Sequence, residues 1–374
     1  MEKLPFRDFH LLHLLEDYSN FDRPLDVAIC RYFRANKSLG SKDRYEISES
    51  AYALVRWAGL LEALYPKAGW RTWLKALREG CLQNPPATLP AHTKVSFPKE
   101  LFDRIVHSLG EKEAVRICHV CNTPAPTYVR ANTIKISRDE LLQRWADKYE
   151  VSPAKVSPEG IIFNKKIHFF SIDEFKEGLF EVQDEASQLI SGLVNATPGN
   201  LVMDFCAGAG GKALAIAPRL QGKGQLYLHD IREHALTEAK IRFKRAGAQN
   251  VQFLADTSPA LTKLKKKMDW VLADVPCSGT GTLRRNPDMK WRYDDELLQR
   301  LLGQQRMIFE KALSYLKPDG SIVYATCSLL DEENEMQVEH FLKTYGLKLV
   351  GEPFKSIPSF KGMDGFFGAV MKQQ

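Results

Sequence analysis

From about Gln183 onward the chain alternates short apolar runs with stretches at helical spacing, and this alternation restricts the possible folds more than any other feature. The runs predict strands and the intervening stretches predict helices. The expected strands are Leu201–Phe205, Gln225–Asp230, Val251–Ala255, Met268–Val275, Gly320–Ala325, Leu347–Val350 and Gly368–Met371. This order predicts an α/β fold with a doubly wound, seven-stranded, mostly parallel sheet. Ligands of such sheets bind at the carboxyl ends of the strands.

Two further regions precede the sheet in the 374-residue chain. Residues 1–120 carry apolar side chains at helical spacing and predict a helical N-terminal region. Residues 121–182 contain an expected strand, Thr127–Ala131, and an expected helix from Arg138 to Lys148, which together predict a small α/β module. The sheet domain then occupies residues 183–374, so we expect three parts in all.

No stretch of the sequence suits a membrane or an export route. No run of about 18 apolar residues appears, and the segment from Met1 to Asp8 lacks the apolar core of a signal peptide. An odd count of seven cysteines argues against a disulfide framework, so we expect a cytoplasmic protein with reduced thiols. The net charge of +6 fits a nucleic-acid partner but does not require one.

A glycine-rich turn follows the first expected strand and reads Cys206-Ala207-Gly208-Ala209-Gly210-Gly211-Lys212. Glycines let the backbone approach a ligand closely and aim the amides of a helix N-terminus at it. The turn is not a phosphate-binding P-loop, because Lys212 is not followed by Ser or Thr. Taken alone, it is also compatible with a tight connection between a strand and a helix.

Acidic residues close the next three expected strands. Asp230 lies 26 residues after Asp204, where a carboxylate can accept hydrogen bonds from both hydroxyls of a ribose. Asp256 follows the third strand and suits the exocyclic amine of a purine, and Asp274 ends the fourth. Any one of these acids could instead cap a helix or lie in a solvated loop. Together they describe an adenosine-containing cofactor without a polyphosphate grip, for which S-adenosylmethionine fits better than NAD.

Two cysteines are expected at the same edge of the sheet. Cys277 follows the fourth strand, and Cys327 follows the fifth, 50 positions further along. A free cysteine is usually a small buried residue, but both of these lie in loops beside prolyl, glycyl or hydroxyl residues. A thiolate that adds to carbon 6 of a cytosine makes carbon 5 nucleophilic enough to take a methyl group. Asp274 is suited to hydrogen-bond the ring or the amine of that base.

In these segments the chain resembles the Sun (Fmu/RsmB) family of RNA cytosine carbon 5 methyltransferases. The resemblance covers most of the chain and is carried by Leu39–Arg44, Asn122–Asn132, Gln183–Ser187, Cys206–Lys212, Asp274–Gly281, Thr326–Ser328 and Asp364–Phe367. It implies a Rossmann-like S-adenosylmethionine methyltransferase domain in which Cys327 is the nucleophile and Cys277 assists product release. It also implies cofactor contacts from the turn of Cys206 to Lys212 and from Asp230, Asp256 and Asp274.

The resemblance further implies an RNA substrate in which 5-methylcytosine is formed. Small-subunit ribosomal RNA is favoured, and transfer RNA is the alternative. We expect residues 1–120 to bind RNA and the protein to act as a monomer without a membrane partner. A DNA cytosine methyltransferase is the nearest rival, but the Phe-x-Gly-x-Gly turn and the Glu-Asn-Val tripeptide of that class are absent. A non-catalytic RNA-binding assembly factor is a second rival, and the intact cysteine pair argues against it.

Four other features complete the interpretation. The family turn usually reads Cys-Ala-Ala-Pro-Gly-Gly-Lys, and the less rigid pair Gly208-Ala209 replaces Ala-Pro, so cofactor affinity could be lower. The segment from Leu283 to Arg292 interleaves basic residues with Trp291, which suits phosphate contact and base stacking, although a solvated loop would look similar. Cys118 and Cys121 have metal-ligand spacing but no matching second pair, so no metal is expected. Two histidines, His229 and His234, are expected to be structural or exposed rather than catalytic.

Overall fold

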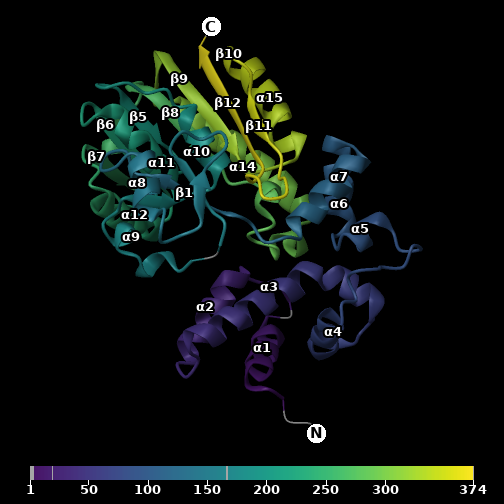
Figure 1. Cartoon of the computed structure of the whole chain (residues 1–374). Helices are drawn as coiled ribbons and strands as arrows, with labels where there is room; N and C mark the ends of the chain where they lie inside the picture. The colour runs from purple at the N-terminus through teal and green to yellow at the C-terminus, as the bar shows by residue number, and fades with distance from the viewer. Residues whose placement is uncertain (1–3, 19, 166, 374) are drawn as a thin grey trace. The chain divides into compact units, whose positions relative to one another are not determined.

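The computed structural model describes residues 4–18, 20–165 and 167–373, so Met1 to Lys3 of the N-terminal stretch considered above lie outside the described residues. The chain divides into two compact units, and Figure 1 labels many of their helices and strands. Unit 1 is the chain up to Pro124 together with Ser278–Leu298. Unit 2 is Ala125–Cys277 together with Gln299–Gln374. Within the described ranges no helix has the length and apolar character needed to span a membrane.

Unit 1 is helical, as the spacing of its apolar residues predicts. Its helices are α1 (Phe6–Asp17), α2 (Leu25–Ala35), α3 (Ser41–Leu64), α4 (Gly69–Arg78), α5 (Ala91–Lys94), α6 (Lys99–Leu109) and α7 (Glu111–Cys121). A proline stands immediately before α1, α2, α5 and α6, where its fixed φ and missing N–H are tolerated. The apolar faces of the first four helices meet in a shared core that includes Leu15, Leu54 and Leu61.

The second segment of unit 1, Ser278–Leu298, fills part of that helical core. It contains the short 3-10 helices η3 (Thr280–Thr282) and η4 (Met289–Arg292). Lys290 is 1% exposed, and its Nζ donates to the Arg56 carbonyl at 2.7 Å and to Asn122 Oδ1 at 2.9 Å. The Trp291 indole N–H donates to the carbonyl of Val55 at 2.7 Å. These bonds fasten the segment to helices that lie far from it in sequence.

Two of the four basic residues of this segment lack the exposed position that phosphate contact requires. Arg284 and Lys290 are each 1% exposed, and burial lowers the pKa of Lys290 well below its usual range. A group held inside the unit by backbone and amide oxygens cannot reach a solvated phosphate. The phosphate interpretation is therefore wrong for Arg284 and Lys290, and it stays a prediction for the half-buried Arg285 and Arg292.

Unit 2 begins with a small antiparallel sheet in the order β2-β3-β1-β4. Its strands are β1 (Thr127–Ala131), β2 (Val151–Pro153), β3 (Gly160–Phe163) and β4 (Phe180–Val182), and the helical pieces around them are α8 (Arg138–Trp145), η1 (Phe169–Ser171) and α9 (Asp173–Lys176). β1 has the predicted bounds, whereas α8 ends at Trp145 rather than Lys148. A capping box between Ser137 and Glu140 starts α8, and the fully buried Trp145 is the centre of this module.

The second sheet of unit 2 has the order β10-β12-β9-β8-β5-β6-β7, with β11 paired to β12. Its strands are β5 (Leu201–Asp204), β6 (Gln225–Asp230), β7 (Val251–Ala255), β8 (Met268–Asp274), β9 (Leu316–Thr326), β10 (Leu347–Leu349), β11 (Phe354–Ser356) and β12 (Phe366–Gln373). The five strands from β9 to β7 in this order are parallel, whereas β12 is antiparallel to each of its neighbours β9, β10 and β11. The doubly wound α/β prediction is confirmed, with the three-residue β11 as an eighth strand.

Helices cover both faces of this sheet. They are α10 (Glu185–Gly192), α11 (Gly211–Ile216), η2 (Ala217–Leu220), α12 (Glu233–Ala246), α13 (Ala260–Lys263), α14 (Asp295–Leu313), η5 (Asp331–Glu333) and α15 (Glu335–Tyr345). Val202 packs in one apolar cluster with α10, α11 and α12, while its neighbour Met203 packs in another with α13, α14 and α15. Successive side chains of a strand point to opposite faces, so the two clusters lie on the two sides of the sheet.

The discontinuous unit 1 leads to a first prediction. A chain that starts at Ala125 loses the helices onto which Ser278–Leu298 packs, so apolar and buried charged groups of that segment become solvent-exposed. We expect limited proteolysis to cut between residues 278 and 298 in the shortened chain and not in the full chain, with cleavage sites read by mass spectrometry. Equal protection of the segment in both chains would contradict this packing.

Candidate cofactor and catalytic site

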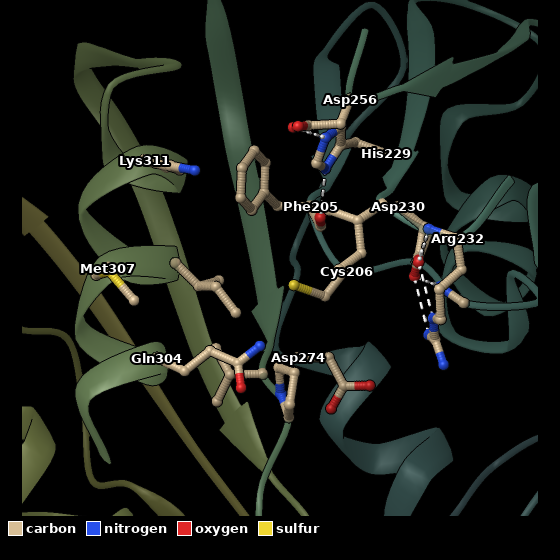
Figure 2. Close-up of a pocket in the computed structure, with 16 residues that line it drawn as sticks. Phe205, Cys206, His229, Asp230, Arg232, Asp256, Asp274, Gln304, Met307 and Lys311 are labelled. Carbon is tan, nitrogen blue, oxygen red and sulfur yellow. Dashed lines mark hydrogen bonds and ion pairs between the residues drawn. The ribbon is translucent and has the colours of Figure 1, made fainter. Parts of the chain in front are cut away.

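A cavity of about 600 Å³ opens at the carboxyl ends of the parallel strands of unit 2 (Figure 2). Its walls come from the ends of β5, β6 and β8, from the residue after β7 and from one face of α14. The lining residues are Phe205, Cys206, Ala207, Gly208, His229, Asp230, Ile231, Arg232, Asp256, Asp274, Val275, Pro276, Gln304, Met307, Ile308 and Lys311. The cavity thus lies at the edge of the sheet where doubly wound folds bind ligands.

Most of the residues expected at a cofactor line this cavity, but four of the seven residues of the glycine-rich turn do not. Cys206, Ala207 and Gly208 are in the lining, and the three strand-end acids join them, namely Asp230, Asp256 and Asp274. The other four residues of the turn lie outside the lining, namely Ala209, Gly210, Gly211 and Lys212.

Gly210 shows what this second part of the turn does. It has φ +77°, and a Cβ there would lie 2.9 Å from Phe243 Cε2 of α12. A glycine at this position therefore lets the start of α11 pack closely against α12.

Asp230 is the acid with the most complete set of hydrogen bonds. Its Oδ1 accepts from the backbone N–H and the Nε of Arg232 at 2.9 and 3.0 Å. Its Oδ2 accepts from the Gly208 N–H at 2.8 Å and from Arg232 Nη2 at 3.0 Å, and Figure 2 shows this arrangement. A carboxylate offers about four acceptor positions, so all of them are in use. A ribose can hydrogen-bond to Asp230 only if the Arg232 side chain moves away from that carboxylate.

The turn in which Gly208 and Ala209 depart from the usual family sequence is held by contacts on both sides. Gly208 has φ +52°, a backbone conformation that glycine adopts without strain, and its N–H points to Asp230. The carbonyl of Ala209 accepts from Arg242 Nη1 at 2.8 Å. Arg242 is itself paired with the buried Glu181 at 2.9 Å. These bonds supply part of the rigidity that an Ala–Pro pair would give.

His229, which the sequence interpretation left outside the site, lines the cavity beside Asp256. Its Nδ1 lies 2.8 Å from the Phe205 carbonyl oxygen, and its Nε2 lies 3.3 Å from Asp256 Oδ1. Its ring stacks on that of Phe205 with centroids 4.4 Å apart. Since Asp256 is 61% exposed at its side chain, this contact with a buried histidine is what orients it toward the cavity. His229 is therefore a positioning residue.

A second missed group comes from α14. Gln304, Met307, Ile308 and Lys311 line the cavity opposite the strand ends (Figure 2). Their spacing of three, four and seven residues is the signature of one helix face. That signal was present in the sequence, but the periodicity alone does not say what the face covers.

Asp204, Asp230 and Asp274 lie close together at the strand ends, and their negative charges are compensated unequally. Asp204 is 1% exposed; burial and the neighbouring Asp274 raise its pKa to about 7. Lys212 Nζ lies 2.6 Å from Asp274 Oδ2. Burial lowers the pKa of Lys212, but the Asp274 carboxylate outweighs this and raises that pKa above its usual value. Lys212 therefore remains a cation and neutralises Asp274, while Asp204 is partly protonated near neutral pH.

The two expected reactive cysteines lie side by side. Their Sγ atoms are 3.3 Å apart without a disulfide, and the Cys327 N–H donates to Cys277 Sγ at 3.3 Å. Cys277 is held through the Pro276 carbonyl, which accepts from Gln305 Nε2 at 3.1 Å.

The Cys327 turn is anchored by a buried asparagine. Asn334 Nδ2 donates to the carbonyl of Ser328 at 3.0 Å. Each thiol thus sits on a loop that is fixed by buried amide side chains. In the part of the chain that the structure describes, no cluster of three His, Cys, Asp or Glu side chains is placed to hold a metal.

The donor set fits S-adenosylmethionine. Asp230 has the chemistry to accept from ribose hydroxyls, Asp256 from an exocyclic amine, and apolar side chains such as Ile308 line the same cavity. A parallel sheet with this site defines a S-adenosylmethionine-dependent methyltransferase. The sequence model of the family described as 16S rRNA methyltransferase RsmB/F matches residues 192–372, and the model of a ferredoxin-like domain of RsmF/B-like methyltransferases matches residues 97–169. The chain belongs to the RsmB/F methyltransferase family.

Relatives with known names agree with this membership. A probable ribosomal RNA small subunit methyltransferase B from Synechocystis is 30% identical over 74% of this chain and 67% of its own length. The ribosomal RNA small subunit methyltransferase B of Vibrio vulnificus is 33% identical over 68% of this chain and 61% of its own length. The chain therefore spans only about three fifths to two thirds of these relatives.

Solved structures show the same fold. A methyltransferase homolog protein from Pyrococcus horikoshii is 28% identical with a TM-score of 0.68, over 77% of this chain and 99% of that one. NSun6 from Pyrococcus horikoshii, whose structure was determined with SFG, has a TM-score of 0.67 at 21% identity, over 74% of this chain and 98% of that one. The second likeness concerns the fold alone.

The occupied carboxylate of Asp230 gives a second prediction. Asp230→Ala should weaken S-adenosylmethionine binding about 10- to 100-fold, because hydrogen bonds to a charged acceptor contribute about 1.5–3 kcal/mol. Arg232→Ala should leave affinity unchanged or tighten it up to about fivefold, because the ligand no longer has to displace an exposed ion pair. Isothermal titration calorimetry measures both constants. Weaker binding by Arg232→Ala would mean that the arginine contributes to the cofactor site instead of competing with it.

The raised pKa of Asp204 gives a third prediction. Between about pH 4 and pH 7 the folded chain binds more protons at this position than the unfolded chain does. The unfolding free energy therefore falls with rising pH across this window, by at most about 1.4 kcal/mol per pH unit. Asp204→Asn should remove that slope, whereas Asp147→Asn at an exposed position should keep it. Urea unfolding at several pH values measures the slope, and an unchanged slope in Asp204→Asn would contradict the prediction.

Proposed function

We propose that this protein methylates carbon 5 of a cytosine in RNA, with S-adenosylmethionine as methyl donor and a covalent bond between Cys327 and the base as intermediate. The single observation that carries the proposal is the pair of thiols 3.3 Å apart at the edge of the sheet where the cofactor cavity opens. Methylation of an exocyclic amine needs no thiol, whereas carbon 5 chemistry needs one nucleophile and a second group to complete elimination.

The charges around Cys327 support its role as the nucleophile. The Lys212 cation, held by Asp274 at 2.6 Å, interacts electrostatically with Cys327. In the proposed reaction the Cys327 sulfur carries negative charge as it attacks the base and again as it leaves. A fixed ammonium group near that sulfur lowers the energy of both states. This arrangement gives Lys212 a task at the reactive site rather than at the cofactor.

The reaction divides into addition and elimination. The Cys327 thiolate donates an electron pair to carbon 6 of the cytosine, and a carbon–sulfur bond forms while carbon 5 becomes electron-rich. S-adenosylmethionine, when bound, supplies an electrophilic methyl group that carbon 5 takes. Cys277 gives its own proton to solvent, and the resulting thiolate then accepts the carbon 5 proton. The ring regains its double bond, and the bond to Cys327 breaks with its electron pair returning to sulfur. Asp274, paired to Lys212, is suited to orient the ring or its amine.

We propose ribosomal RNA of the small subunit as the substrate, with the reaction taking place in the cytoplasm. The Synechocystis and Vibrio vulnificus relatives are named as ribosomal RNA small subunit methyltransferases, which supports this substrate. Two adjacent reduced thiols are consistent with a reducing compartment. Bisulfite sequencing of total RNA from cells with and without this gene tests the substrate, and a cytosine that loses its methyl group in the deletion identifies the site.

The two thiols give the fourth prediction. Cys277→Ala should still form the adduct and transfer the methyl group, and should then stall with RNA attached to Cys327. Cys327→Ala should form no adduct and no 5-methylcytosine. Cys30→Ser, at an exposed cysteine, is the matched control and should behave like the unaltered protein. A denaturing gel of each variant with RNA and S-adenosylmethionine shows the adduct as a shifted band.

Other band patterns identify the rival mechanisms. A shifted band for Cys327→Ala and none for Cys277→Ala would make Cys277 the nucleophile, as in the DNA enzymes. Full turnover in both variants would exclude covalent catalysis. Absence of 5-methylcytosine with the unaltered protein on every RNA tested would favour a non-catalytic RNA-binding role.

A further inference from the structure

Unit 1 contains a second cavity, of about 530 Å³, whose walls include four aromatic side chains. Phe21, Trp70, Trp73 and Trp291 line it, and the exposed residues Glu62 and Lys67 stand at it. We call this group the aromatic cleft. All six residues belong to unit 1, so the cleft is separate from the cavity and thiols of unit 2. Its volume lies in the range of ligand sites, about 300–1,000 Å³.

The aromatic rings are fixed in place rather than loosely exposed. The Trp291 indole N–H is bound to the Val55 carbonyl at 2.7 Å, and the Trp73 indole N–H to the Tyr65 carbonyl at 3.4 Å. Gly59 makes room for Trp291, because a Cβ at that glycine would lie 2.7 Å from the Trp291 ring. Rings that are held by the backbone lose little conformational entropy when a ligand binds between them.

The polar groups of the cleft match a nucleotide. Within the described residues the Trp70 N–H has no hydrogen-bond partner, so it can donate to a base, and the Glu62 carboxylate can accept from a base amino group. Lys67 offers a cation for a phosphate. Helix α4, which carries Trp70 and Trp73, has three basic residues and no acidic one.

Stacking, more than charge, favours RNA over a protein ligand. Among the described residues that line the cleft, Lys67 is the one cation and Glu62 the one acid. Lys67 can attract one phosphate, and helix α4 carries its basic residues outside the lining. Every base has a π-face, so fixed indole rings bind unpaired bases by stacking.

We propose that the aromatic cleft binds an unpaired base of the RNA substrate other than the cytosine that reacts. This proposal rests on the proposed function, since it takes RNA as the ligand. It also gives Trp291 the base-stacking role predicted from the sequence of Leu283–Arg292. The cations Arg284 and Lys290 of the same segment are buried inside unit 1. Unit 1 then contributes RNA affinity through one defined contact and not only through general charge.

The first test is direct binding of a short fluorescein-labelled single-stranded RNA, measured by fluorescence anisotropy with the full chain. Trp70→Ala should raise Kd about 5- to 100-fold, because stacking contributes about 1–3 kcal/mol per base, and Trp70→Phe should restore most of the affinity. Phe9→Ala, which removes an exposed ring of unit 1 outside the cleft, is the control and should leave Kd unchanged. Unchanged binding in Trp70→Ala, or equal loss in Phe9→Ala, overturns the proposal.

The surface variant Lys67→Ala provides a test that does not depend on the stability of the core. It should weaken RNA binding and reduce the slope of log K against log salt by about 0.7, the value for one phosphate contact on a single strand. An unchanged slope would count against a nucleotide in the cleft. If Lys67→Ala loses a protein that the unaltered chain captures, while its RNA binding is unchanged, the cleft takes a protein ligand. That result would also overturn the proposal.

Catalysis separates this inference from the proposed function. With RNA that the unaltered protein methylates, Trp70→Ala should raise KM for RNA while kcat and the Kd for S-adenosylmethionine stay the same. Methylation by the unaltered protein together with an unchanged KM in Trp70→Ala refutes the cleft and leaves the proposed function standing. Absence of methylation refutes the proposed function, and the anisotropy experiment still decides whether the cleft binds RNA.

Discussion

The common edge of the parallel strands is the constraint on which the rest of unit 2 depends. In this sheet Asp204 pairs with Leu272 of β8, and Asp274 of β8 pairs with Ala325 of β9. This register ends β5, β8 and β9 at nearly the same level, so the loops that follow them must share one small volume. Cys277 and Cys327 come three and two residues after a paired position, which brings two sulfur atoms together from segments 50 residues apart. Hydrogen bonding of the backbone thus sets the geometry of the reactive groups.

The same convergence concentrates negative charge, and the protein compensates for it with specific cations. Asp274 has Lys212 and Asp230 has Arg232, while the buried Asp204 has no cation within ion-pair distance among the described residues and carries a raised pKa instead. The two cations differ in burial: Lys212 is enclosed, and Arg232 is 58% exposed at its side chain. An enclosed cation keeps its partner permanently neutralised. An exposed one can return to water when a ligand takes its place.

Much of the sheet could be predicted from sequence, because its strands are short apolar runs closed by acids or glycines. β6 and β7 have the predicted bounds, and α12 ends at Ala246 before Gly247 in the left-handed conformation, as a glycine cap requires. The sequence placed Cys277 and Cys327 at the ends of two strands that could be neighbours, and β8 does pair with β9. The pairing of Arg232 with Asp230 and the α14 wall did not follow, because both depend on side-chain directions that periodicity does not give. The three-residue β11 is too short to show a period of its own.

The insertion of Ser278–Leu298 into the helical unit has a consequence for the order of folding during synthesis. A domain at the N-terminus usually folds first, while the rest of the chain is still being made. Unit 1 cannot complete its core in that way. Lys290 and Trp291 are translated only after strands β5 to β8 of the large sheet. The helices before residue 124 must therefore wait with an unfilled gap on the ribosome. Translation speed and chaperone contact in this interval should matter more for this protein than the chain's length alone suggests.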